Sequence, residues 1–362
     1  MKIYFFTKYN KQGASSRYRS IQYFNDFSDN GYQINHQPLF NDLYLKLKYK
    51  KNYLFIFILI SSYLTRFFSI IKLILFRPEI IIIEKELFPY LPINEGGVLS
   101  FFKINYILDY DDAIWHNYDL FLIKNLMYNK FSNLAKKSKV VFSGSHYLKE
   151  SLIKFGSKKN YLIPTVVDLN KYPKHKYNNE GKFIIGWIGS PSTSAYLFDL
   201  NSVLTDFCNR NNALVHLVGF DENLSKKLNF KFKLIKWSKE TEVDEINKFS
   251  VGLMPLPNSR FAQGKCGFKL IQYMASGISV IASDFGENKF IVDDGINGIL
   301  CKDEITWRNA LNFFYENKKK RQIFGENGRN KVESIYNKKT QFQYLIKIIN
   351  NTIDEKKNSY NL

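Results

Sequence analysis

A strand, a loop with two glycines, a short helix and a second strand follow one another between residues 251 and 283. The apolar run VGLMPLP at residues 251–257 predicts the first strand, residues 268–276 predict the helix, and residues 279–283 predict the second strand. In an open parallel sheet such loops lie at the carboxyl ends of the strands, where α/β proteins bind ligands, and amides at a helix start attract phosphate. The segment therefore predicts an α/β fold with a ligand site at the edge of a sheet.

The same alternation of strand and helix runs through the rest of the chain. Further strands are expected at residues 1–6, 80–83, 106–108 and 140–142, and again at 183–189, 213–219 and 232–237. A polar segment without apolar periodicity, residues 166–182, separates the two series. We therefore expect a first domain at 1–165, a linker at 166–182, a second domain at 183–337 and a C-terminal helix within 338–362.

Three polar side chains stand out in the otherwise apolar segment around the predicted helix. Lys265, Lys269 and Gln272 are spaced four and three residues apart. If Lys265 continues the helical path, all three share one face and point at one ligand. The alternative is a buried helix whose two lysines reach solvent along its surface.

Residues 264–275, GKCGFKLIQYMA, and the following SGISVIAS resemble the nucleotide-sugar site of retaining glycosyltransferases of family 4. That family usually carries two glutamates eight positions apart, in a pattern like EGFGLxxLEAMAxGxPVVAS. In this chain the two glutamate positions hold Gly264 and Gln272. The contacts that the glutamates usually make to ribose and phosphate are therefore not expected in their usual form. A subset of the family, in which GKCGFKxxQYMA replaces the glutamates, is similar to this chain throughout the motif.

The resemblance implies the GT-B fold, α/β with two doubly wound Rossmann-like domains, an interdomain cleft, and a last helix that crosses back to the first domain. It implies transfer of a sugar with retention, from a nucleotide-sugar donor to a saccharide or lipid-linked saccharide, as in the synthesis of cell-surface polysaccharides. The nucleotide sugar is then a substrate, and neither a cofactor nor a bound metal is expected.

The loop GASSRYR, residues 13–19, follows the first strand. Backbone amides and two arginines there suit a diphosphate or an anionic acceptor, and the loop resembles the one found in the same subset. The alternative is an ordinary helix start capped by Ser15 or Ser16. We predict a functional loop, with Arg17 the main contact.

Three carboxylates, Asp109, Asp111 and Asp112, follow the strand at 106–108. Such groups repel one another unless one is protonated, hydrogen-bonded or matched by a cation. We expect Asp109 and Asp111 to hold acceptor hydroxyls, whereas Asp112 could instead cap the next helix. The D-x-D spacing is also typical of the metal site of the GT-A fold, which the second half of the chain argues against.

The turn GWIGSPST, residues 186–193, resembles the first turn of the family's second domain but lacks its basic residue. Hydroxyls and helix-start amides are left to hold phosphate there, so the positive charge is expected from Lys265 and Lys269. The predicted site residues form three groups. They are the catalytic residues Arg17, Asp109, Asp111, Lys265 and Lys269; the donor-binding residues Gly13, Gly189, Ser190, Trp237, Gly267, Lys269 and Gln272; and the acceptor-binding residues Arg19, Glu86 and Asp112.

The chain is strongly basic, with 52 Lys and Arg against 33 Asp and Glu and a formal charge of +19. This suggests an anionic partner, although lysine accompanied by abundant Asn, Ile, Tyr and Phe is also a product of codon bias. Two other functions stay open. One is a non-catalytic or nucleic-acid-binding protein of transferase-like fold, although no nucleic-acid motif is present and we expect no nucleic-acid partner. The other is an epimerase that acts on the nucleotide sugar itself.

The most hydrophobic region, residues 53–75, is interrupted by polar side chains, so no apolar run reaches the length that spans a bilayer. We expect a core helix of the first domain. Lys46, Lys48, Lys50 and Lys51 lie just upstream, so the alternative is that this helix rests on a membrane surface. No signal-peptide pattern opens the chain, and Cys208, Cys266 and Cys301 lack disulfide or metal spacing. We therefore expect a cytoplasmic location, with peripheral membrane association at the inner face as the alternative.

Overall fold

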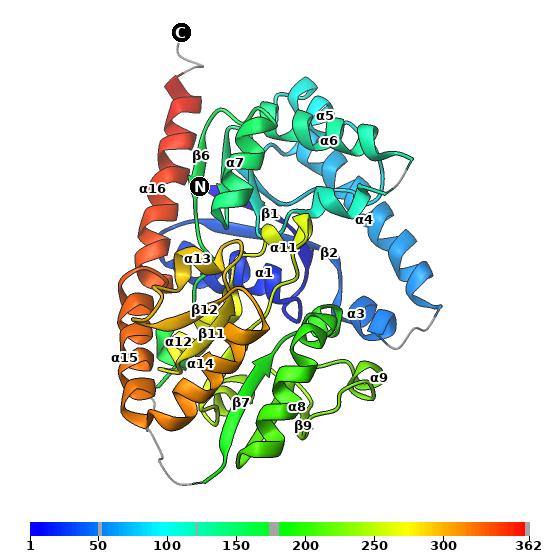
Figure 1. Ribbon diagram of the computed structural model, residues 1–362. Helices are drawn as coiled ribbons and strands as arrows, with labels where there is room; N and C mark the ends of the chain where they lie inside the picture. Colours follow the sequence, from blue (N-terminus) through cyan, green and yellow to red (C-terminus); the bar gives the residue numbers. More distant parts are fainter. Residues whose placement is uncertain (50–52, 121, 174–180, 359–362) are drawn as a thin grey trace. The chain divides into compact units, whose positions relative to one another are not determined.

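The computed structural model describes residues 1–49, 53–120, 122–173 and 181–358 (Figure 1). The chain divides into two units, Met1–Thr165 with Gln341–Leu362, and Val166–Thr340. Each unit contains one six-stranded sheet whose paired strands are all parallel, so the prediction of two doubly wound α/β domains is confirmed. Residues 174–180 of the predicted linker, and Lys50 and Lys51, lie outside the described residues.

The sheet of the first unit has the order β2-β1-β3-β4-β5-β6. Every residue of its central strands β3, β4 and β5 is buried, as expected for parallel strands covered on both faces. The strands are β1 (Lys2–Tyr9), β2 (Gln33–Phe40), β3 (Ile80–Glu84), β4 (Tyr106–Tyr110), β5 (Val140–Ser143) and β6 (Asn160–Leu162).

The strand β2 was not expected from the sequence. Its run QINHQPLF is largely polar and contains Pro38, which cannot donate to a ladder. Because β2 lies at the edge of the sheet, its backbone has to pair on one side only, and both features are tolerated there.

The chain between β1 and β2 forms three short helical pieces. The backbone of Ser20 leaves the helical region, so the chain turns between the first and second pieces. The helices of this unit are α1 (Ala14–Arg19), η1 (Ile21–Tyr23), α2 (Phe24–Asp29), α3 (Asp42–Tyr49), α4 (Phe55–Leu75), α5 (Glu95–Phe101), η2 (Ile114–Tyr118), α6 (Lys124–Lys137) and α7 (His146–Lys154).

The last helix, α16 (Lys338–Asn358), starts in the second unit, and from Gln341 onward it belongs to the first unit (red in Figure 1). The ring of Phe342 lies 6.0 Å from that of Tyr23 and 5.0 Å from that of Phe27. Aromatic packing thus covers the η1 and α2 segment with the C-terminal helix.

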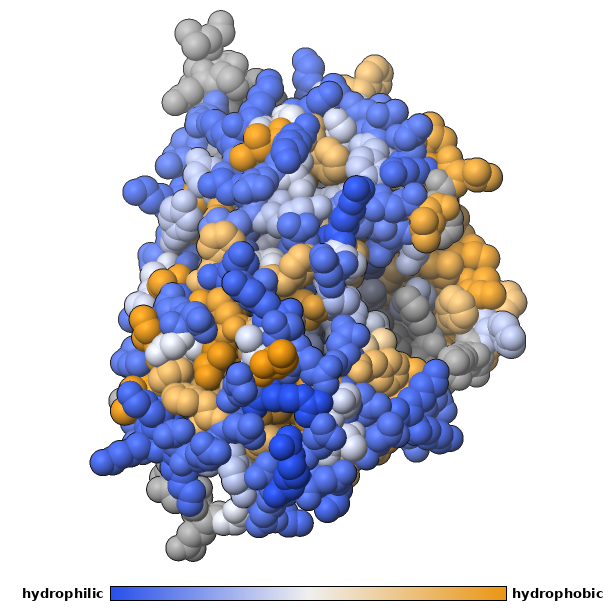
Figure 2. All heavy atoms as spheres, viewed as in Figure 1, coloured by the Kyte–Doolittle hydropathy of each residue, from blue (hydrophilic) through white to orange (hydrophobic). Residues whose placement is uncertain are grey.

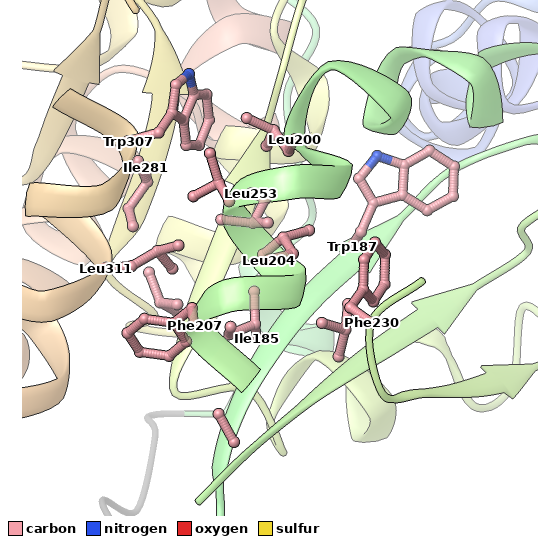
Figure 3. Close-up of a cluster of buried hydrophobic side chains, with 14 of the residues drawn as sticks. Ile185, Trp187, Leu200, Leu204, Phe207, Phe230, Leu253, Ile281, Trp307 and Leu311 are labelled. Carbon is pink, nitrogen blue, oxygen red and sulfur yellow. The ribbon is translucent and has the colours of Figure 1, made fainter. Parts of the chain in front are cut away.

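The sheet of the second unit has the order β12-β11-β10-β7-β8-β9. Side chains of its strands, among them Trp187, and of its helices, among them Phe207 and Trp307, form a buried core (Figure 3). The strands are β7 (Phe183–Ile188), β8 (Ala213–Val218), β9 (Phe232–Ile235), β10 (Val251–Met254), β11 (Val280–Ser283) and β12 (Gly298–Cys301). The helices are η3 (Leu169–Lys171), η4 (Pro191–Leu200), α8 (Asn201–Arg210), α9 (Glu222–Ser225), α10 (Glu242–Ile246), α11 (Arg260–Gln263), α12 (Phe268–Ala275), α13 (Asn288–Ile291), α14 (Glu304–Glu316) and α15 (Lys318–Ser334).

The strand order of each sheet reverses once. In the first unit the chain moves outward from β1 to β2 and then continues on the other side of β1 with β3; in the second it moves outward from β7 and returns with β10. At such a switch point the loops after the two neighbouring strands part, and ligands of open α/β sheets bind there. The loops after β1 and β3, and after β7 and β10, are therefore the places to look for a site.

The helix α4 corrects one expectation. Residues 53–75 do form a helix of the first unit, but only Arg66, Ile70 and Leu73 of α4 are buried, so it is not a core helix. With 21 residues, α4 is also long and apolar enough, by length and composition, to cross a membrane, because its serines and threonine do not offset the aliphatic and aromatic residues between them.

Candidate functional site

The turn after β7 brings the backbone of Gly189 close to two neighbours. A Cβ on Gly189 would lie 2.5 Å from the Trp187 ring and 3.0 Å from Cε of Lys269. A Cβ on Gly219, whose φ is +72°, would lie 2.3 Å from the carbonyl oxygen of Gly189. Both positions need glycine, because their lack of side chains lets Trp187, Lys269 and the backbone of Gly189 pack closely at the switch point.

Lys269 lies over this turn. Its Nζ is 3.5 Å from Oγ1 of Thr193 and 4.5 Å from the centre of the Trp187 ring. Burial, together with the charge of Lys265, lowers the pKa of Lys269 to about 7. Among the described residues no carboxylate forms an ion pair with it. A bound anion would supply the missing negative charge and stabilise the ammonium form.

Hydroxyl groups line the same turn. Ser190 precedes η4, and its Oγ lies 2.9 Å from that of Ser192. The N–H and the hydroxyl of Thr193 both donate to the carbonyl oxygen of Ser190, at 3.0 and 3.1 Å. The predicted donor residues Gly189, Ser190 and Lys269 are thus brought together by the structure.

Lys265 does not lie on the helix that carries Lys269. The helix α12 starts at Phe268, after Gly267, which has a left-handed φ of +61° and whose Cβ would lie 2.3 Å from Ile291. The conditional prediction of one helical face for Lys265, Lys269 and Gln272 is therefore wrong, because Gly267 turns the chain before the helix begins. The Nζ of Lys265 lies 4.7 Å from the centre of the Phe261 ring, and its charge still reaches Lys269.

Gln272 and Trp237 have partners within the second unit. The amide of Gln272, which is buried, donates to the hydroxyl of Tyr172 at 3.2 Å. The indole N–H of Trp237 donates to Glu242 at 2.9 Å, and its Cβ is 3.1 Å from the position a Cβ on Gly219 would take. Trp237 thus lies near the glycine turn, whereas Gln272 anchors the segment that contains Tyr172. Nucleotide binding by either residue stays a prediction.

The switch point of the first unit contains a buried polar cluster formed by Ser15, Ser16, Glu84, Lys85 and Asp111. Ser16 donates to Glu84 at 2.5 Å and accepts from the N–H of Tyr9 at 2.9 Å. The ammonium of Lys85 lies 2.7 Å from Asp111 and 3.0 Å from Oγ of Ser15. The cluster joins the loop after β1 to the ends of β3 and β4.

The protonation of this cluster follows from its contacts. Oγ of Ser15 is 2.7 Å from Glu84 and 2.5 Å from Asp111, yet it has a single proton to donate. Burial raises the pKa of Glu84, against the opposing charge of Lys85. Burial acts the same way on Asp111, but Lys85 and Ser15 outweigh it and lower the pKa of Asp111 to about 2. A protonated Glu84 that donates to Ser15, which in turn donates to ionised Asp111, satisfies all three groups.

Lys85 stands in an uncommon backbone conformation at the end of β3. Its φ is +67°, a left-handed value that costs a non-glycine residue roughly 1 kcal/mol or more. Burial lowers the pKa of Lys85, but Asp111, Asp112 and Glu84 together raise it well above its ordinary value. This conformation points the Lys85 ammonium at the carboxylates of the cluster. The resulting ion pairs offset the cost of the strained backbone.

The arginines of the GASSRYR loop point in different directions. Arg19 is buried against Asp109, to which its Nε donates at 3.1 Å, and it also donates to the carbonyl oxygen of Ile163. Arg17 donates to the carbonyl oxygen of Lys11 at 3.5 Å and stacks on Tyr18. Gly13 precedes α1, where a Cβ would lie 2.3 Å from Cβ of Tyr9.

Asp109 is engaged in the interior instead of standing open at the strand end. Burial raises its pKa, and Arg19 opposes this. The pair Arg19 and Asp109 links α1, β4 and the end of β6, which is a positioning arrangement. Contact of either residue with an acceptor stays a prediction, as it does for Arg17 and Gly13.

Asp112 and Glu86 have separate surroundings. The carboxylate of Asp112 lies 3.7 Å from Lys85, and Ala113 is the residue before η2, so Asp112 does not cap that helix with its side chain. Glu86 is buried, and its carboxylate lies 2.7 Å from the ammonium of Lys130, which also contacts Glu95 at 2.9 Å. Glu86 thus helps to hold the loop after β3, and its contact with an acceptor stays a prediction.

Sequence reasoning missed three residues of these two places: Glu84, Lys85 and Trp187. The signal for the first two was a charged pair placed directly after a wholly apolar strand. Trp187 gave no signal, because an aromatic residue in a strand is ordinary core material until its ring is found beneath a lysine.

Residues 170–331 match the family model of glycosyl transferases group 1. Among curated protein sequences, none matches the chain.

Several solved structures resemble the whole chain. Sucrose-phosphate synthase from Thermosynechococcus elongatus has a TM-score of 0.72 at 13% identity and covers 98% of this chain and 100% of its own. HepE from Anabaena, in complex with UDP-glucose, has a TM-score of 0.70 at 13% identity, covering 97% and 100%. A glycosyltransferase from Rickettsia africae ESF-5 has a TM-score of 0.69 at 12% identity, covering 97% and 98%.

At these identities the likeness establishes the fold, and it agrees with the two parallel six-stranded sheets. The chain therefore has the two-domain GT-B fold of these glycosyltransferases, and its residues 170–331 carry the glycosyl transferases group 1 sequence pattern.

Proposed function

We propose that the protein transfers a glycosyl unit from a nucleotide sugar to a hydroxyl of a saccharide or lipid-linked saccharide, with retention, in the synthesis of a cell-surface polysaccharide. The observation that carries the proposal is Lys269, a cation without a carboxylate partner among the described residues, which lies over the glycine turn at a switch point within the matched region. A diphosphate is the ligand that a glycine turn, hydroxyls and such a lysine suit together.

The chemical work of the second unit is electrostatic. When the bond between the sugar and the diphosphate breaks, negative charge grows on the leaving phosphate. A preorganised ammonium beside it stabilises this added charge, so it stabilises the transition state more than the bound donor. Lys269 would supply this ammonium, Thr193 would orient it, and Lys265 would add charge from just before α12. Gly189 and Ser190 would offer backbone and hydroxyl groups to the same phosphates.

The first unit would hold the acceptor. Sugar hydroxyls need acceptors and donors at fixed positions, and the cluster around Lys85 provides both. Asp111 and Asp112, the more exposed carboxylates of the cluster, have 13% and 23% of their side chains exposed, so they would be the groups that meet a hydroxyl. Glu84, Ser15 and Ser16 lie behind them and would fix their orientation. HepE, which shares the fold, has been solved with UDP-glucose. For this chain the proposal names neither the sugar nor the base, which the titration below is to identify.

The proposal is tested by titrating UDP, GDP and ADP against the protein, followed by assays with the corresponding nucleotide sugars, with and without saccharide acceptors. Binding of one nucleotide and acceptor-dependent release of it would support the proposal. Conversion of the sugar nucleotide without acceptor would favour an epimerase. Failure of all nucleotides to bind, together with salt-sensitive binding of RNA or DNA, would favour the nucleic-acid alternative.

The activity should fall as the pH rises above neutrality. The pKa of Lys269 is about 7, and only its protonated form neutralises a diphosphate, so kcat/KM for the donor should drop by about tenfold per pH unit above that value. In Lys269→Arg the charge persists at all these pH values, and the decline should disappear. Parallel pH profiles from pH 6 to 9 for the two proteins would contradict this role, and Lys248→Arg, at an exposed lysine just after α10, serves as control.

Activity should not depend on a divalent metal. The carboxylates Asp109, Asp111 and Asp112 are assigned to structure and acceptor binding, with Arg19 and Lys85 matching their charges. Turnover measured in excess EDTA should therefore equal turnover in buffer alone. A loss that Mg²⁺ or Mn²⁺ restores would instead assign the diphosphate to a metal.

A further inference from the structure

One side of α4 exposes a continuous stripe of large apolar residues. Phe57, Ile60, Leu64, Phe68, Ile71 and Leu75 recur at spacings of three and four, and each has between 40% and 72% of its surface exposed. At 3.6 residues per turn these side chains share one side of the helix, opposite the buried Arg66, Ile70 and Leu73. Figure 2 shows orange, hydrophobic side chains over the part of the surface where α4 lies in Figure 1. We call this stripe, with the exposed residues at both ends of α4, the α4 face.

The α4 face is larger than the stripe itself. Leu43 on α3, Tyr53 and Leu54 before α4, and Phe76 after it are also more than half exposed. Scattered apolar residues are normal on a protein surface, but a contiguous patch of this extent marks an interaction site.

Within residues 43–78, the segment that carries this face, the charges have one sign, and Asp42 and Glu79 lie just outside it. From residue 43 to residue 78 the sequence contains no Asp or Glu, and its charged residues are Lys46, Lys48, Lys50, Lys51, Arg66, Lys72 and Arg77. Of these, Lys46, Lys72 and Arg77 are exposed in the structure, whereas Arg66 is buried. Exposed aromatic and aliphatic residues flanked by basic ones are complementary to a bilayer with anionic headgroups.

The opposite side of α4 is tied to the sheet. The guanidinium of Arg66 donates to the carbonyl oxygens of Thr7 at 2.8 Å and Gln37 at 3.1 Å, and it stacks on the Phe6 ring at 4.7 Å. The hydroxyl of Tyr63 donates to the carbonyl oxygen of Pro89 at 2.6 Å. A helix that crosses a membrane would have to break these contacts and place Arg66 in hydrocarbon, which is costly. Although α4 is long enough to span, its contacts argue for a position in the plane of the interface.

We propose that the α4 face is a docking surface for an anionic membrane, on which α4 lies flat with its apolar stripe among the lipid chains and with Lys46, Lys72 and Arg77 at the phosphates. The proposal stands on the exposure, the charges and the anchoring of α4, and does not rest on the proposed glycosyl transfer. It identifies the surface by which peripheral membrane association would occur.

The test is sedimentation of the full-length protein with vesicles of phosphatidylcholine alone and of an equimolar mixture of phosphatidylcholine and phosphatidylglycerol. Binding should be stronger to the mixture and should weaken with salt. The double variant Phe57→Glu with Phe68→Glu should lower the partition coefficient by about tenfold or more, because two apolar contacts are lost and two negative charges are added. Both residues are well exposed, so the variant should remain folded by circular dichroism.

Ile305→Glu is the matched control, since Ile305 is a 69% exposed apolar residue on α14 of the other unit. It should bind vesicles like the unchanged protein. Unchanged binding of the double variant would overturn the proposal. Protein that stays with the vesicles after a carbonate wash would overturn the flat position in favour of spanning. A dimer that the double variant dissociates in light scattering, without an effect on vesicle binding, would assign the face to a second copy of the chain.

Discussion

Replacement of Lys269 with alanine is expected to lower kcat/KM for the nucleotide sugar by about 100-fold or more, the loss typical of removing one charged contact to a transition state. The ammonium lies over the turn at Gly189, beside Thr193, where a leaving diphosphate would develop its charge. The fold should survive the change. Burial lowers the pKa of Lys269, which means that the folded protein disfavours its charged form, so loss of the charge itself costs no stability, and only the contacts with Thr193 and Trp187 are lost.

Two variants make the result specific. Lys269→Arg keeps the charge with a different shape and should retain more activity than Lys269→Ala. Lys289→Ala removes an exposed lysine of the same unit and should leave the kinetics unchanged. A folded Lys269→Ala protein with the kinetics of the unchanged enzyme would exclude the lysine from the chemistry and remove the observation on which the proposed function rests.

Replacement of Lys85 with methionine should lower the free energy of unfolding at neutral pH by about 3–5 kcal/mol, the range for breaking a buried ion pair from one side. The ammonium is 2.7 Å from Asp111 and 3.9 Å from Glu84, and 4% of its side chain is exposed. Methionine fills a similar volume but leaves the ionised Asp111 without its cation. Urea-induced unfolding, followed by circular dichroism, measures the difference.

The pH dependence of this loss has a definite sign. In the unchanged protein the pKa of Asp111 is about 2, below its ordinary 3.8, so its contribution to stability is present above pH 4 and is lost as the pH falls through 2. Without Lys85 the largest influence that lowers this pKa is lost, so Asp111 of the variant takes up its proton at a higher pH than Asp111 of the unchanged protein. The difference in stability should therefore shrink as the pH falls from about 4 toward 2.

The exposed pair of Lys159 and Glu355 in the same unit gives the control. Lys159→Met removes an ion pair of 2.6 Å, but solvent screens it, and the expected change is at most about 1 kcal/mol. If Lys85→Met were as stable as the unchanged protein at neutral pH, Lys85 would not stabilise the cluster. The left-handed backbone of Lys85 would then not be explained by its contacts with the carboxylates.

The sequence was a reliable guide wherever the signal was local and repeated. Wholly apolar runs such as residues 80–83 and 251–254 became buried parallel strands, because a strand covered on both faces has no room for a polar residue. The turn at Gly189 and the start of α12 could also be located from the sequence, because neighbouring atoms leave no room for a Cβ at Gly189 or Gly267. Local patterning failed at β2, whose polar run with Pro38 is acceptable only because the strand lies at an edge.

By itself, the sequence determined the succession of strands and helices, and hence two α/β units with polar loops at the carboxyl ends of their strands, because hydrophobic periodicity is written residue by residue. Only the tertiary structure decided which polar side chains meet. Glu84, Lys85, Ser15 and Asp111 come together across 96 residues of sequence because β1, β3 and β4 are neighbours in one sheet. Lys269 is placed over Trp187, and in the described part of the chain no carboxylate pairs with it. The same holds for α4, whose apolar composition suited a core helix until the sheet was found to cover only the side that carries Arg66. Pairing and burial depend on which strands and helices are neighbours, and that is a property of the packed chain that no local pattern contains.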